Sequence, residues 1–93
     1  MLEEHNWIEN LTTIREYLTK EFQGLLMTED SSDPGILHKF TMTNSKTDEQ
    51  FKLKVGWPRL SDKSSNPEKI VRSLVHGGVA GKMRQQKGKY FYW

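Results

Sequence analysis

The side chains best suited to chemistry are the bases and aromatic rings near the end of the sequence. Residues 69–93 contain six Lys and Arg side chains and no carboxylate, and the stretch ends in Tyr-Phe-Tyr-Trp. An ammonium or guanidinium group can neutralise a phosphate and release its counterions. A tyrosine ring can stack on an unpaired base. This combination predicts contact with a polyanion such as nucleic acid.

The rest of the chain divides by charge in the same way. Residues 1–50 hold ten acids and four bases, whereas residues 51–93 hold ten bases and two acids. The net charge of +2 therefore conceals a dipolar sequence. If the two halves lie against each other, weak surface ion pairs neutralise them. If the basic half stays exposed, it forms a positive face that attracts a partner.

We expect a small, non-catalytic, regulatory nucleic-acid-binding protein, with DNA and RNA both open as ligands. The candidate phosphate contacts are Lys52, Lys54, Arg72, Lys82, Arg84, Lys87 and Lys89, and the candidate stacking rings are Tyr90 and Tyr92. The alternative is an adaptor or inhibitor that recognises a protein partner. Complementary charge would orient that partner, and Trp57, Tyr90, Tyr92 or Trp93 could serve as an aromatic anchor. The acidic loop 29–33 could equally be the contact.

Catalytic and metal-binding patterns have little support. The glycine-rich segment 77–82 has His76 where a phosphate-binding loop needs its first glycine, and Met83 where the loop needs Ser or Thr. The three histidines lack metal-ligand spacing, and no serine lies in a nucleophile-elbow pattern. We therefore expect no enzyme activity, no metal and no cofactor.

The composition also indicates where such a protein would work. The sequence has no Cys, and therefore no disulfide framework. No apolar run approaches the roughly 18 residues of a membrane span, and the first residues are acidic where a signal peptide would be basic. We expect a cytoplasmic protein that contacts no membrane.

Two helices are predicted, within one domain over residues 1–93. Apolar residues recur every three or four positions from Trp7 to Phe22, which predicts a helix over 6–23 that ends at Gly24. Asn66 and Pro67 are a typical helix start. They predict a second helix that stops at the glycine pair 77–78.

Strands are predicted between the two helices. A short strand at 25–28 precedes an acidic turn cluster at 29–35, and a second strand follows at 36–44. After a loop at 45–49, residues 51–57 alternate between apolar and basic or small side chains, which is typical of a half-buried strand. The last two strands would form a hairpin whose outer face carries Lys39, Lys52 and Lys54. Residues 58–65 are predicted to be a loop.

The final segment has two interpretations. Residues 79–85 and 89–93 could form a basic hairpin around a turn at 86–88. Alternatively, the helix resumes after the glycines and only 89–93 joins the sheet. In both cases we expect Phe91 and Trp93 to pack inward, opposite Tyr90 and Tyr92.

These elements predict an α+β fold. A single small domain would have an antiparallel β-sheet of three to five strands packed against two α-helices, in the order α-β-β-β-α-(β-β). An aromatic strand at the sheet edge could also pair with a second copy, so a homodimer stays open.

Overall fold

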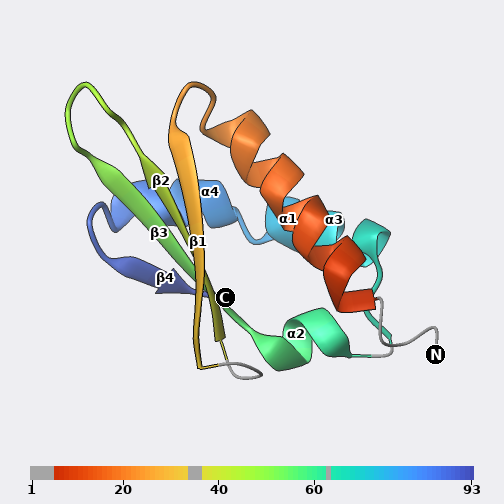
Figure 1. Ribbon diagram of the computed structural model, residues 1–93. Helices are drawn as coiled ribbons and strands as arrows, with labels where there is room; N and C mark the ends of the chain where they lie inside the picture. The colour runs from red at the N-terminus through yellow and green to blue at the C-terminus, as the bar shows by residue number, and fades with distance from the viewer. Residues whose placement is uncertain (1–5, 34–36, 63) are drawn as a thin grey trace.

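A computed structural model describes residues 6–33, 37–62 and 64–93. Within these residues, four helices and four strands make a small α+β domain, as predicted (Figure 1). The helices are α1 (Asn6–Glu21), α2 (Trp57–Ser61), α3 (Pro67–His76) and α4 (Val79–Gln85). The strands are β1 (Leu26–Asp33), β2 (Leu37–Thr43), β3 (Gln50–Gly56) and β4 (Tyr90–Tyr92).

The two longest helices agree with the prediction. The apolar stripe is buried from Leu11 to Leu18 in α1 and at Phe22 immediately after it, and Gly24 has a φ of 84°. Asn66 caps α3, because its side chain accepts a hydrogen bond from the Lys69 N–H at 2.9 Å. No helix in the described part of the chain is both long enough and apolar enough to cross a lipid bilayer.

The four strands form one sheet in the order β1-β2-β3-β4. The pairs β1–β2 and β2–β3 are antiparallel, whereas β4 is parallel to β3. The prediction of a purely antiparallel sheet is therefore wrong at the β4 edge. Since three helices carry the chain back to the starting end of β3, the last strand runs in the same direction as β3.

The predicted C-terminal hairpin is also wrong, and the alternative is confirmed. Residues 79–85 form α4, and only the segment after the turn at 86–88 joins the sheet. Gly78, with a φ of 58°, starts α4. The Tyr17 hydroxyl of α1 accepts a hydrogen bond from the Ala80 N–H at 3.1 Å. This contact, between residues distant in the sequence, stabilises the helical turn.

Two further predictions need correction. Strand β1 continues to Asp33, through most of the turn cluster predicted at 29–35, while residues 34–36 lie outside the described residues. The loop predicted at 58–65 contains α2, which starts at Trp57. Leu60 of α2 is fully buried, and its carbonyl accepts a hydrogen bond from the Asn10 side chain at 2.8 Å. Burial of Leu60 favours a helix, because the helix satisfies the backbone groups beside it.

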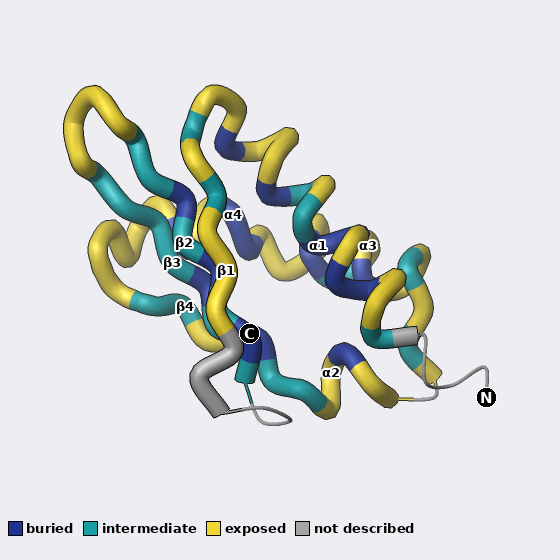
Figure 2. The backbone as a smooth tube through the Cα atoms, in the orientation of Figure 1, coloured by how far each residue is buried: buried dark blue, intermediate teal, exposed yellow. Residues whose placement is uncertain are grey.

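All four helices lie on the same side of the sheet, and α3 packs against α1 and α4. One core cluster joins buried side chains of every helix to Phe40 and Met42 of β2 and to Leu53 and Val55 of β3. Figure 2 shows these buried segments in dark blue on the strands and the helices. The alternate residues of the strands point to the opposite face. We call this opposite side, which no helix of the described chain covers, the open face.

Candidate functional site

The open face is built by strand alternation and register. Core-facing residues of β2 and β3 are buried, and the residues between them are partly exposed. The register aligns the open-face residues in rows across the sheet. One row is Asp30, Lys39, Lys54 and Tyr92, and the next is Thr28, Thr41, Lys52 and Tyr90.

Three lysines gather around one tyrosine on this face. The Nζ atoms of Lys39, Lys52 and Lys54 lie 5.6, 5.1 and 4.8 Å from the centroid of the Tyr90 ring. We call these four residues the lysine cluster. Each ammonium group is attracted to the electron-rich face of the ring. Parallel pairing of β4 creates this arrangement, because it places Tyr90 directly beside Lys52.

One carboxylate neighbours the lysine cluster in the sheet, because Asp30 of β1 is the cross-strand partner of Lys39. None of its lysines forms an ion pair with a carboxylate of the described residues. Lys39 and Lys54 stand directly opposite each other on neighbouring strands, and like charges in that position repel. An anion placed between them would relieve this repulsion.

Arg84, one of the candidate phosphate contacts, makes contacts within the protein. Its Nη2 donates a hydrogen bond to the Glu21 carbonyl at 2.6 Å, and its guanidinium group lies 4.6 Å from the centroid of the Phe22 ring. That carbonyl is at the end of α1, where helix carbonyls lack partners within the helix. Arg84 therefore joins α4 to the end of α1.

Three other predicted bases also lie apart from the lysine cluster. Arg72 is exposed on α3 and pairs with Glu68 at 3.3 Å. Lys82 of α4 lies 5.6 Å from the ring of Phe91, a residue that packs against the core. Lys87 forms an ion pair with Glu49.

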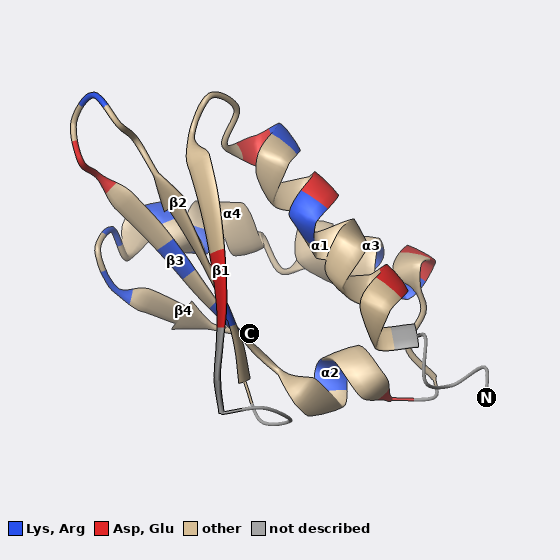
Figure 3. Cartoon of the chain, viewed as in Figure 1, with Lys and Arg blue, Asp and Glu red and all other residues tan. Residues whose placement is uncertain are grey.

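The structure therefore brings together only part of the predicted site. Lys52, Lys54, Tyr90 and Tyr92 share the open face, joined by Lys39 from the predicted hairpin face. Lys89 is exposed immediately before β4. Figure 3 shows basic segments on β3, in the turn before β4 and on α4, so the positive charge is spread over both sides of the sheet.

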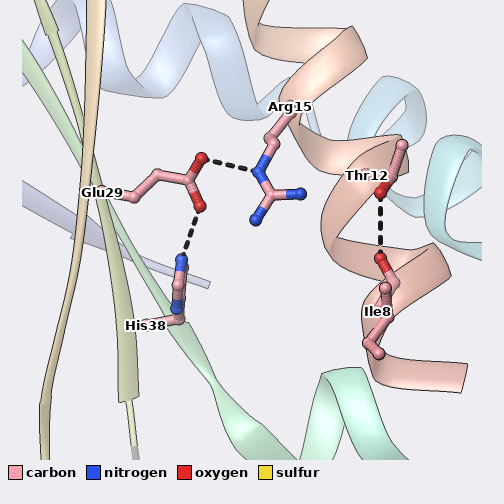
Figure 4. Close-up of polar contacts among 5 residues, drawn as sticks. All are labelled: Ile8, Thr12, Arg15, Glu29 and His38. Atoms are coloured by element: carbon pink, nitrogen blue, oxygen red, sulfur yellow. Dashed lines mark hydrogen bonds and ion pairs between the residues drawn. The ribbon is translucent and has the colours of Figure 1, made fainter. Parts of the chain in front are cut away.

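A second polar cluster, which the sequence analysis missed, joins α1 to the sheet (Figure 4). Arg15 Nε donates a hydrogen bond to Glu29 Oε2 at 2.6 Å, and His38 Nε2 lies 2.9 Å from Glu29 Oε1. Burial opposes ionisation of Glu29, but the hydrogen bonds from Arg15 and His38 outweigh it and lower the pKa of this carboxyl. The sequence signal that could have placed His38 in this cluster is the two-residue alternation of β2, which puts His38 on the same face as Phe40.

The contacts of this second cluster connect α1 to two strands of the sheet. Both oxygens of Glu29 are engaged, one by α1 and one by β2. The other ring nitrogen of His38, Nδ1, is buried without a hydrogen-bond partner in the described part of the chain. Across the described residues, no three side chains of His, Cys, Asp or Glu gather in a way that could hold a metal ion.

Together, the fold and the site define a class: a small α+β domain with one face covered by helices and one open face that carries lysines around a tyrosine. No protein-family model, curated protein or solved structure matches this chain. Function must therefore be inferred from the open face itself.

Proposed function

We propose that the open face binds nucleic acid and that the protein is a non-catalytic, regulatory binding protein. The observation that supports this most is the lysine cluster, in which three ammonium groups surround Tyr90 and form no ion pair with a carboxylate of the described chain. Exposed bases are usually hydrated and balanced by mobile counterions, or paired with a single acid. A cluster held together by one ring and lacking acids is suited to a ligand with repeated negative charges.

The spacing of the sheet is compatible with a chain of phosphates as the ligand. Neighbouring strands are about 4.8 Å apart, and residues two apart on one strand are separated by roughly 6.7 Å. Lys39, Lys52 and Lys54 therefore start from separate points on a flat surface. A chain of phosphates can contact all three at once, and each contact releases counterions.

The negative charge of Asp30 also influences which strands the ligand would lie over. Asp30 occupies the β1 end of the row that contains Lys39 and Lys54, and it is exposed. Its carboxylate repels phosphates. We therefore expect the nucleic acid to lie over β2, β3 and β4 and to avoid β1.

The experiment is a titration of a labelled single-stranded oligonucleotide at a series of salt concentrations. The variant Lys52→Gln/Lys54→Gln should bind about tenfold more weakly at ~50 mM salt, and the slope of log K against log salt should become shallower by about 1.4. The matched control is Lys20→Gln/Lys69→Gln, which removes the same charge from exposed positions on α1 and α3. This control should retain both the affinity and the slope.

Two results would contradict the proposal. One is the absence of binding by the unmodified protein at ~50 mM salt, which would favour a protein partner instead. The other is an equal loss of affinity in both double variants, since net charge rather than the lysine cluster would then govern binding.

A further inference from the structure

An open groove of about 500 Å³ lies at the end of β3, beside the lysine cluster. Its lining includes Gly56, Arg59, Asp62, Ser65, Tyr92 and Trp93. Tyr92 connects the two regions, because it lines the groove and also pairs with Lys54 in the sheet.

The groove offers surfaces on which a flat ring can stack. Tyr92 is 64% exposed. The guanidinium group of Arg59 lies 4.2 Å from the centroid of the Trp93 ring, and Arg59 forms no ion pair with the described residues. Aromatic rings and stacked guanidinium groups are the side chains on which unpaired bases stack.

Asp62, the one carboxylate among the residues that line the groove, disfavours binding of a phosphate there. Asp62 Oδ1 accepts hydrogen bonds from the Ser64 backbone N–H at 2.8 Å and from the Ser64 hydroxyl at 2.7 Å. These hydrogen bonds, the backbone one first, lower the pKa of Asp62. The ionised carboxylate repels phosphate oxygens but can accept hydrogen bonds from the N–H groups on the edge of a base.

Tyr90 is less suited to stacking than Tyr92. Three ammonium groups lie around its ring, and the residue is only partly exposed. The two tyrosines therefore have separate roles: Tyr90 organises the lysines, whereas Tyr92 is available to a base.

We propose that this groove takes an unpaired nucleobase from a strand whose phosphates lie on the lysine cluster, so that the protein selects single-stranded over double-stranded nucleic acid. The proposal rests on the function proposed above and adds the class of ligand. In a duplex, each base is stacked and paired, and its ring faces cannot enter a groove on a protein surface.

The test compares three labelled probes of equal length: a single-stranded oligonucleotide, its duplex, and an abasic deoxyribose-phosphate strand. The unmodified protein should bind the single strand about tenfold more tightly than the abasic strand, because stacking of one base on a side chain contributes an effect of that size. Binding of the single strand should also quench the fluorescence of Trp93, and Trp93→Phe identifies that signal.

Variants at residue 92 separate stacking from charge. Tyr92→Leu should lower affinity for the single strand about tenfold and leave affinity for the abasic strand unchanged. Tyr92→Phe keeps the ring and should bind like the unmodified protein. The exposure of Tyr92 means that both variants should fold, which a thermal melt can check.

The outcomes distinguish failure of this inference from failure of the proposed function. If none of the three probes binds at ~50 mM salt, the nucleic-acid function itself is wrong. If all three probes bind equally, or if Tyr92→Leu weakens the abasic and base-carrying strands alike, the lysine cluster binds phosphates but the groove takes no base.

Discussion

The lysine cluster and three bases elsewhere in the molecule use similar side chains in different ways. Arg15, Arg84 and Lys87 all have oxygen partners within the molecule: two carboxylates and a helix carbonyl. We call these three the engaged bases. The lysines of the cluster have a ring beside them but no carboxylate partner in the described chain. Whether a basic side chain is available to a ligand therefore depends on whether an oxygen of the protein already accepts its hydrogen bonds. The local density of positive charge matters less.

The largest expected effect on stability is at Glu29, the partner of Arg15. Glu29→Gln should lower the free energy of unfolding by about 1–2 kcal/mol at pH 7, because it weakens two hydrogen bonds that involve a charged group. Denaturant titration of both proteins would measure this difference.

The same variant tests the pH dependence. Because the pKa of Glu29 is lowered in the folded protein, the carboxylate stabilises the fold above its ordinary pKa of 4.5. That contribution is lost as the pH falls through the lower folded-state pKa. Glu29→Gln should lack this part of the acid destabilisation. A pH profile identical to that of the unmodified protein would show that Glu29 is not engaged as described.

Arg84→Gln should lower the free energy of unfolding by about 1 kcal/mol, through loss of a charge-assisted hydrogen bond and of packing on Phe22. The affinity of this variant for the oligonucleotide should stay within about twofold of the unmodified value, since the guanidinium group of Arg84 is engaged by Glu21 and Phe22 and is not part of the lysine cluster. A stable Arg84→Gln variant with much weaker binding would break the comparison between the two regions.

Lys39→Gln should change the free energy of unfolding by less than about 0.5 kcal/mol. It removes one cation–π contact, but it also relieves repulsion between Lys39 and Lys54. Oligonucleotide binding should weaken in the same variant. If Lys39→Gln destabilises the protein as much as Arg84→Gln does, the lysine cluster is a structural element like the engaged bases.

The smallest effect is expected at Lys87. Its ion pair with Glu49 is exposed to solvent, and pairs of this kind contribute little. Lys87→Gln should leave the melting temperature unchanged at physiological salt. A clear drop in melting temperature that disappears in 1 M salt would show that this ion pair stabilises the turn before β4. The engaged bases would then include exposed ion pairs that contribute to stability.

The parts of the fold that the sequence predicted are those with a local cause. The apolar stripe of α1, the Asn66 cap of α3 and the alternation of β3 each depend on neighbouring residues. The helix at 79–85 was ambiguous because a segment of only seven residues that contains a glycine, Gly81, satisfies both helix and strand patterns. The hydrogen bond that stabilises this segment as a helix is accepted by the hydroxyl of Tyr17, a residue distant in the sequence.

The candidate site shows the same limit. Alternation predicted that Lys52 and Lys54 share a face and that Tyr90 and Tyr92 oppose Phe91, which packs against the core. The parallel pairing that brings these two pairs together is a long-range contact with no local signal. Nor could charge alone show that Arg84 and Lys87 would find partners at Glu21 and Glu49.

Strand β4 completes the open face by pairing with β3. The Trp93 N–H donates to the Lys54 carbonyl at 2.7 Å, and the Gly56 N–H donates to the Trp93 carbonyl at 3.3 Å. During translation, the three lysines leave the ribosome well before Tyr90 does. The open face therefore forms only after β4 pairs with β3, because residues 90–92 supply both the partner strand of β3 and the Tyr90 ring.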